Sequence, residues 1–408
     1  RYAERLFPDH NEVRLRRSHL LCTKERFQEA YEILLDLERR DPTNTDVLYA
    51  LGAVHSAMGN HRKAIQYYLK TSRDGYELGT VFANVGDEYA DLGLDRDAMG
   101  FYQRALEKAP KEERAIHGLC ECYENLQKQQ QGVEYFSQFV EKHPYSAVAW
   151  YCLGLLYSDL KLYEKAIDAF EYTTTINPKL HEAYTFKAYA FHDLGDITHA
   201  IACLREALDH VEDKGHVNSL IAYYYMESGN FDTALIYLRA AVDADPSDGP
   251  CWMAMASCYA QQNEYYPAHD CMERAFRECP NEPALLIDAA RIYSTFGEDE
   301  QAESCFEEGL SLTSYDDRCW TDYADFLLDR SLWDKAIDVL NRGLSRCDEP
   351  LYFHLRLAEA YFRTGRRNHL FNALQACVQI DRAAALELLE VCPQMGLDLE
   401  VMNTLTSE

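Results

Sequence analysis

Small and apolar residues recur along this chain with a period of 34 residues. The clearest copy reads, in order, Trp150-x-x-Leu153-Gly154-x-x-Tyr157, Ala166-x-x-x-Phe170 and Pro178. Copies begin at residues 11, 45, 79, 113, 147, 181, 215, 249, 283, 317 and 351, without insertions between them. Within each copy the apolar residues follow the three- and four-residue spacing of one helix face. The pattern therefore predicts eleven pairs of amphipathic helices.

Four positions of the period indicate how the two helices of a pair pack and turn. Position 8, counted from the start of each copy, is small throughout, and position 20 is Ala in nine copies. Small side chains on both helices let the two axes approach closely. Position 15 is Gly in six copies, which suits a left-handed turn after the first helix. Position 32 is Pro in six copies, where the second helix must end. Trp150, at position 4, should contribute about 3–5 kcal/mol to stability if its side chain is buried between helices.

This combination of residues resembles the tetratricopeptide repeat, whose period and signature it shares. The resemblance covers residues 11–384 and implies an all-α fold, a right-handed α-solenoid of helix-turn-helix repeats. Such an array leaves no room for a separate catalytic domain, because the copies span 374 of the 408 residues. Long proteins made only of these repeats, many from bacteria and of unknown role, are the nearest likeness.

The two ends of the chain differ from the repeats between them. Residues 1–10 have the character of the tail of a truncated preceding repeat, with Pro8 at position 32. Residues 385–408 are predicted to form capping helices, because the last repeat of an array would otherwise expose an apolar face. Leu388, Val401 and Leu405 supply apolar side chains for that purpose.

The charge of the chain limits the partners that it can bind. Its 40 basic and 68 acidic residues give a formal net charge of −28. A nucleic-acid-binding protein needs a basic surface, and anionic membranes would repel this chain, so neither partner is expected. A basic segment of another protein would be attracted. Alternatively, the acidic excess only keeps a long open array soluble.

The 14 cysteines are predicted to be free thiols that pack as small apolar side chains. Cys203, Cys271 and Cys305 share position 23 of their repeats, and the chain has no C-x-x-C motif. This many free thiols favour a reducing, cytoplasmic compartment. Neither a metal site nor a cofactor is predicted.

The sequence contains no motif that indicates catalysis. It lacks a glycine-rich phosphate loop, an H-E-x-x-H helix and a nucleophile elbow, and its 14 histidines are scattered. No catalytic residues are therefore assigned, and the chain is predicted not to be an enzyme.

The resemblance also implies where partners bind. In arrays of this family the first helix of each repeat lines a concave groove, into which positions 2, 5, 9, 12 and 13 point. The candidate groove residues in this sequence are Tyr49, Asp87, Asp91, Glu121, Tyr151, Leu155, Asp159, Tyr189, Asp193, Tyr223, Glu227, Arg291, Asp325 and Asp329.

Two interpretations of these groove residues remain open. The acids at position 13 lie at the end of the first helix, where the helix dipole disfavours a negative charge. They serve either solubility or a basic partner. Tyr151, Tyr189 and Tyr223 come from three consecutive repeats and either pack on neighbouring repeats or form a shared binding strip.

The leading hypothesis is a non-enzymatic scaffold that binds a partner protein or an extended peptide in this groove. The alternatives are a homo-oligomerising structural module and a regulatory subunit of an enzyme complex. The sequence alone names no partner.

Overall fold

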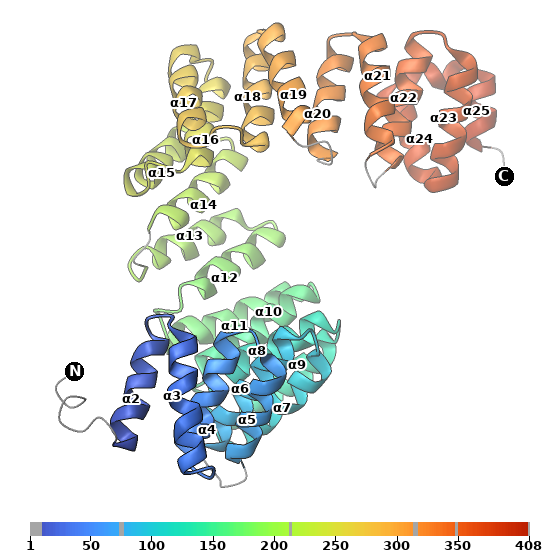
Figure 1. Ribbon diagram of the computed structural model, residues 1–408. Helices are drawn as coiled ribbons and strands as arrows, with labels where there is room; N and C mark the ends of the chain where they lie inside the picture. The colour runs from blue at the N-terminus through green and yellow to red at the C-terminus, as the bar shows by residue number, and fades with distance from the viewer. Residues whose placement is uncertain (1–9, 73–76, 212–213, 313–316, 347–349, 407–408) are drawn as a thin grey trace. The chain divides into compact units, whose positions relative to one another are not determined.

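The computed structural model describes residues 10–72, 77–211, 214–312, 317–346 and 350–406 (Figure 1). The residues of the tail predicted at 1–10 lie outside these ranges except for His10. The described chain is all-α and consists of paired antiparallel helices, as the period predicts.

The described residues contain eleven helix pairs, which follow one another along the chain. The first helices of the pairs are α2 (Asn11–Cys22), α4 (Thr45–Ala57), α6 (Leu78–Asp91), α8 (Glu113–Asn125), α10 (Ala147–Asp159), α12 (Glu182–Asp193), α14 (Lys214–Glu227), α16 (Gly249–Gln261), α18 (Pro283–Phe296), α20 (Asp317–Asp329) and α22 (Pro350–Arg363). The second helices are α3 (Phe27–Arg40), α5 (His61–Thr71), α7 (Asp95–Lys108), α9 (Gln129–Lys142), α11 (Tyr163–Ile176), α13 (Ile197–Ala207), α15 (Phe231–Ala244), α17 (Tyr265–Glu278), α19 (Asp299–Leu312), α21 (Trp333–Leu344) and α23 (Arg367–Ile380). Every first helix begins within one residue of a predicted start.

After the last pair come α24 (Arg382–Val391), a short 3-10 helix η2 (Pro393–Leu397) and α25 (Leu399–Thr406). Val401 and Leu405 on α25 are fully buried in the same apolar cluster as Leu374 and Cys377 of α23. These C-terminal helices therefore cover apolar residues of the final pair. The side chain of Leu388 lies outside the described residues.

The chain divides into two compact units, residues 1–212 (unit 1) and 213–408 (unit 2). Unit 1 contains α2 to α13 and unit 2 contains α14 to α25. The division falls between two helix pairs, so no repeat is split between the units.

Every repeat turns between its two helices through one residue with positive φ at position 15. Glycine occupies this position in the six copies noted above, with φ between 69° and 78°. Asn263 has φ 59°, and the remaining copies use Glu25, Gln127, Lys161 and Ser331 in the same conformation. The left-handed turn therefore recurs even where the sequence does not favour it.

Close packing of the two helices in a pair depends on the small residue at position 8. A Cβ atom added to Gly154 would lie 2.5 Å from a ring carbon of Phe170, and one added to Gly86 would lie 2.5 Å from Tyr102. Both rings belong to position 24 of their repeats, which lies on the second helix, and both are buried. The glycine thus creates the space that the aromatic ring fills.

Trp150 is only half-buried, so the condition set above for its full contribution to stability is not met. Its ring stacks on Tyr172 with centroids 4.4 Å apart, and its Nε1 donates a hydrogen bond to the Pro144 carbonyl. Trp320, at the same position of repeat 10, is instead fully buried.

Candidate partner-binding groove

The candidate groove residues divide between the two units. Unit 1 contains Tyr49, Asp87, Asp91, Glu121, Tyr151, Leu155, Asp159, Tyr189 and Asp193, and unit 2 contains Tyr223, Glu227, Arg291, Asp325 and Asp329. Of the three tyrosines considered as a shared binding strip, Tyr151 and Tyr189 belong to unit 1 and Tyr223 belongs to unit 2. The geometry of each unit has to support a binding surface separately.

A concavity of about 1100 Å³ lies between α2 and α4 in unit 1. It is lined by Leu15 and His19 of α2 and by Asp46 and Tyr49 of α4, among others. These are groove positions 2, 5 and 9 of the repeat. The Tyr49 hydroxyl accepts a hydrogen bond of 2.9 Å from the Asn84 side chain, and its ring lies 5.5 Å from that of Tyr68. Tyr49 thus lines the concavity but is held by its own chain.

Aromatic side chains form a continuous row across α8, α10 and α12. The aromatic row comprises His117, Tyr151, Phe186 and Tyr189, whose neighbouring ring centroids lie 5.9–6.0 Å apart. Tyr151 is only 8% exposed, because Phe170 and Phe186 both pack against it. Tyr151 therefore packs on the neighbouring repeat, which is the first of the two interpretations left open above. Tyr189, at 38% exposure, forms the accessible end of the row.

Leu155 is half-buried and packs against the apolar cluster that contains Tyr151 and Phe170. Phe186 was missed by the sequence analysis because it occupies position 6, outside the set of groove positions. The sequence feature that could have identified Phe186 is an aromatic residue at a position where most repeats have a small or polar one. In unit 2, Tyr223 is more exposed, at 56%, and contacts the ring of Tyr224.

Three carboxylates on α8 and α10, the helices that contain His117 and Tyr151, are linked electrostatically, because two of them act on the third. This acidic group comprises Glu121, Glu124 and Asp159. Burial raises the pKa of Glu124, and the charges of Asp159 and Glu121 raise it further. Burial also raises the pKa of Asp159. The pKa of Tyr151 is also raised, mainly by burial. The negative charges of Glu182 and Glu124 raise it further. Carboxylates that repel one another in a partly buried site favour a cation nearby.

Glu124 is the second residue that the sequence analysis missed. It lies at position 12, which belongs to the predicted groove positions, so reading that position in every repeat would have found it. Its Oε1 also accepts a hydrogen bond from the Cys120 thiol.

Several acids at position 13 have partners at position 17 of the preceding repeat. Asp91 lies 3.6 Å from Nδ1 of His61. Gln129 donates a hydrogen bond to Asp159, and the Tyr163 hydroxyl donates one to Asp193. These links between consecutive repeats give Asp91, Asp159 and Asp193 a structural role in addition to any role in solubility or partner binding. Glu227 and Asp329 in unit 2 are exposed.

Other candidate acids are paired with arginines of the chain itself. The Tyr102 hydroxyl donates to Asp87 at 2.8 Å, and Arg114 lies 3.2 Å from the same carboxylate. In unit 2, Arg356 lies 2.9 Å from Asp325. Arg291 lies 2.7 Å from Asp322 of the next repeat. Arg318, in the same repeat as Asp322, lies 2.6 Å from Asp288. Residues at groove positions 2 and 9 thus pair with residues at position 6, and α18, α20 and α22 are joined by ion pairs.

The cysteines are free thiols throughout the described residues, and most are buried. Burial raises the pKa values of Cys203, Cys271 and Cys305 to about 11. Thiols with such pKa values stay protonated at neutral pH, so these three are poor nucleophiles.

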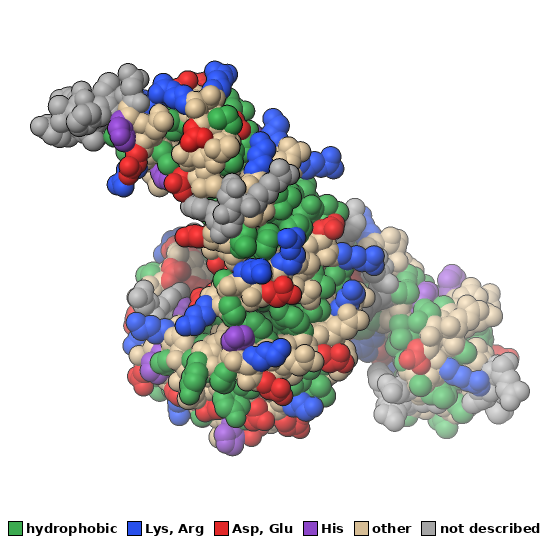
Figure 2. All heavy atoms as spheres, turned by 90° about the horizontal axis from the view of Figure 1, so that it is seen from below, with side chains coloured by type: hydrophobic (Ala, Val, Ile, Leu, Met, Phe, Trp, Pro, Cys, Tyr) green, Lys and Arg blue, Asp and Glu red, His purple; other side chains and the backbone are tan. Residues whose placement is uncertain are grey.

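The net negative charge does not collect into one patch on the face shown in Figure 2. Acidic and basic side chains alternate there with apolar ones. Within the described residues no helix is both long enough and apolar enough to span a bilayer.

Paired helices with a left-handed turn in every 34-residue copy define a helical repeat protein. Tetratricopeptide repeat models match residues 45–70, 121–146, 147–180, 187–249 and 219–283. The chain is a tetratricopeptide repeat protein. Domains of this kind generally bind other proteins as interaction scaffolds and are typically non-catalytic.

Solved structures show the same fold, although no curated protein matches the chain in sequence. Yeast Tom70 is 12% identical, with a TM-score of 0.53 over 98% of this chain and 100% of that one. A tetratricopeptide repeat protein from Parabacteroides merdae is 18% identical over 61% of this chain and 98% of its own, with a TM-score of 0.42. The Cut9–Hcn1 hetero-tetramer of the APC/C contains a chain that is 16% identical over 87% of this chain and 84% of its own, with a TM-score of 0.43.

Proposed function

We propose that this protein is a non-enzymatic scaffold that binds an extended segment of a partner protein on the first helices of unit 1. The aromatic row binds apolar side chains of that segment, with Tyr189 as the accessible contact. The acidic group binds its lysine or arginine side chains. The observation that carries the proposal is the aromatic row across α8, α10 and α12, which ends at the accessible Tyr189.

The charge of the bound segment follows from the repulsion within the acidic group. A cation placed among Glu121, Glu124 and Asp159 would relieve their repulsion and lower the raised pKa values of Glu124 and Asp159. The ion-pair network of unit 2 offers less to a basic segment, since Arg318 and Arg356 already lie against Asp288 and Asp325. Unit 1 is therefore the better site for a basic partner.

The test is a pull-down from lysate of the source cell with the complete chain, followed by titration of the captured protein. Tyr189→Ala and the double variant Glu121→Gln/Asp159→Asn should each weaken its binding by about tenfold or more, as expected for interface anchors. The matched controls are Tyr145→Ala, an exposed tyrosine in the loop between α9 and α10, and Glu164→Gln/Asp168→Asn, exposed acids on α11.

Controls that bind like the wild type, beside weakened groove variants, would support the site. Equal affinity for all variants would move the binding surface away from the aromatic row and the acidic group. Self-association of the pure chain in sedimentation, with no captured protein, would favour the oligomerising module instead.

A further inference from the structure

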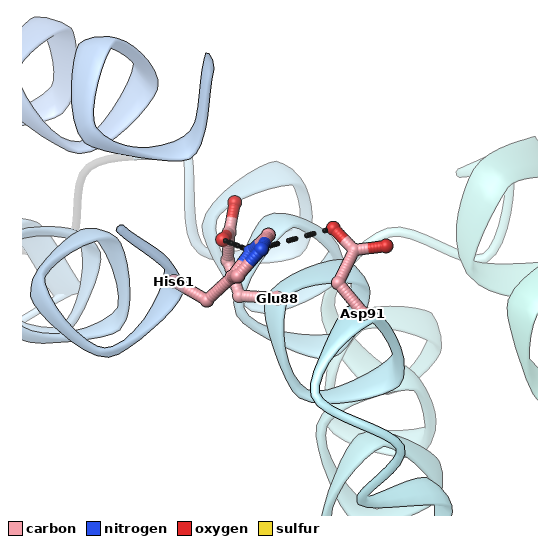
Figure 3. A group of neighbouring side chains, drawn as sticks. All are labelled: His61, Glu88 and Asp91. Carbon is pink, nitrogen blue, oxygen red and sulfur yellow. Dashed lines mark hydrogen bonds and ion pairs between the residues drawn. The ribbon is translucent and has the colours of Figure 1, made fainter. Parts of the chain in front are cut away.

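Three side chains with metal-binding atoms meet between the second and third repeats. His61 is the first residue of α5, and Glu88 and Asp91 lie on α6. Nδ1 of His61 lies 2.8 Å from the Glu88 carboxylate and 3.6 Å from that of Asp91. All three donor atoms lie within 4.8 Å of one another, and Figure 3 shows the imidazole ring directed between the two carboxylates.

A buried carboxylate, that of Glu88, distinguishes this junction from the others. Glu88 occupies position 10 of its repeat and is only 3% exposed. The other ten repeats have uncharged residues at position 10: Leu20, Val54, Cys122, Leu156, Ala190, Tyr224, Cys258, Ile292, Phe326 and Ala360. A buried carboxylate is unfavourable unless a positive charge compensates it. The only charged residue at this position thus lies against a histidine and a second acid.

The histidine alone compensates the two carboxylates incompletely. One ring nitrogen faces both acids, and a single N–H can donate a strong hydrogen bond to only one of them. Two carboxylates with a protonated imidazole still carry a net negative charge. A divalent cation in place of that proton would neutralise both acids and use the imidazole lone pair.

The spacing of the donors suits a transition-metal ion. Metal–ligand distances of about 2.0–2.2 Å in a tetrahedral site place the donor atoms roughly 3.4 Å from one another. The separations from the His61 nitrogen lie on either side of that value. One imidazole with two carboxylates is a ligand set for Zn²⁺ and similar first-row ions.

We propose that His61, Glu88 and Asp91 bind a divalent transition-metal ion, for which Zn²⁺ is the probe. Asp91 is 58% exposed and His61 25%, so the ion can enter from solvent and water can complete its coordination. The bound ion joins the second helix of repeat 2 to the first helix of repeat 3. It therefore stabilises the folded state of this junction, since the ligands are brought together only by folding.

Neighbouring junctions show the same link without the third ligand. Position 17 pairs with position 13 of the next repeat in Asp95–Asn125, Gln129–Asp159 and Tyr163–Asp193. Position 10 adds an uncharged residue in each case. Within the described parts of the chain, the group at His61 is the one set of three such donors that meets the distance limit.

The test uses the complete chain, freed of metal with EDTA and kept reduced, and titrated calorimetrically with Zn²⁺. Glu88→Gln keeps the shape and a hydrogen-bond acceptor for His61 but removes the charge. It should weaken one Zn²⁺ site by about tenfold or more and abolish the corresponding Zn²⁺-induced rise in Tm. His199→Gln is the matched control, because His199 pairs with Asp196 at 2.6 Å as an exposed two-residue pair. It should leave that site unchanged.

X-ray absorption of the Zn²⁺-loaded protein provides a second measurement, with nitrogen and oxygen neighbours expected around the ion. Zn²⁺ affinities that are equal in the wild type and Glu88→Gln, or a sulfur shell that indicates cysteine ligands, would overturn the proposal. If Glu88→Gln fails to fold, Asp91→Asn replaces it, because that exposed side chain can be changed without disturbing the core.

Discussion

At the residue scale, the turn at position 15 adopts positive φ whatever residue occupies it. Glycine adopts this conformation freely, whereas a residue with a Cβ atom is disfavoured by about 1–2 kcal/mol. Glu25, Gln127, Lys161 and Ser331 nevertheless adopt it. Packing of the two helices against each other therefore determines this turn, and the local residue does not.

Replacing Lys161 by Gly should stabilise the protein. The variant removes the unfavourable left-handed conformation of Lys161 but gains backbone entropy in the unfolded state, so the net gain is roughly 0.5–1 kcal/mol. Chemical denaturation measures it. Lys165→Gly, four residues further on inside α11, is the control and should destabilise by about 1 kcal/mol. A destabilised Lys161→Gly would contradict the argument.

The raised pKa of Glu124 makes stability depend on pH in a specific direction. Its folded-state pKa lies above the unfolded value, so its ionised form destabilises the fold. That penalty is present above the folded pKa and disappears as the pH falls through it. Glu124→Gln should therefore be more stable than the wild type at pH 7, and the difference should vanish below about pH 4.3.

Thermal melts at several pH values check this prediction for Glu124. Glu134→Gln is the control, because Glu134 is an exposed acid within α9. A stabilisation of Glu124→Gln that persists at low pH would rule out charge as its cause.

At the element scale, the sequence predicted the helices well because each one repeats the same apolar spacing. It predicted the environment of individual side chains less well. Tyr151 is buried because Phe186 of the next repeat packs on it, and that contact depends on residues 35 positions apart rather than on the pattern within one repeat. Repeat positions define which face a residue occupies, but the neighbouring repeat decides how exposed it is.

The tryptophans at position 4 show the same dependence on neighbours. Trp150 and Trp252 donate hydrogen bonds to the carbonyls of Pro144 and Pro246, which end the preceding repeats, and both are half-buried. Trp320 instead is buried in the core of unit 2, with Arg342 and Arg346 over its ring.

The cost of truncating these tryptophans should differ accordingly. Trp320→Ala should lower the free energy of unfolding by about 3–5 kcal/mol, because it leaves a large cavity. Trp150→Ala should cost about 1–3 kcal/mol, since a half-exposed ring loses one stacking contact and one hydrogen bond. Urea denaturation followed by circular dichroism compares them. Equal losses would show that Trp150 is more buried in solution than its contacts indicate.

At the scale of the whole molecule, the acids behind the net charge of −28 are of two kinds. Some pair with basic residues of the chain itself, and others remain accessible to a partner. Many acids at groove positions hold neighbouring repeats together, as in the pairs Asp87–Arg114 and Asp325–Arg356. Composition predicted the sign of a partner's charge but could not separate these paired acids from the acidic group of unit 1. That distinction requires knowing which repeats face one another.

Binding of the captured partner should weaken as salt rises, because screening acts on contacts between exposed charges. Titrations between low and physiological salt measure the slope. The variant Glu121→Gln/Asp159→Asn should bind with a shallower slope than the wild type, whereas Glu164→Gln/Asp168→Asn should keep the original one. A wild-type affinity that is independent of salt would leave only the aromatic row as the basis of binding.

The constant register of the turns has a consequence for how this array can change over generations. Each copy starts and turns at the same two places, and its contacts with the next copy use the same positions. Loss or duplication of one whole copy would thus join surfaces that are already compatible. The length of the binding surface can evolve in steps of one repeat, while the residues on it diversify independently.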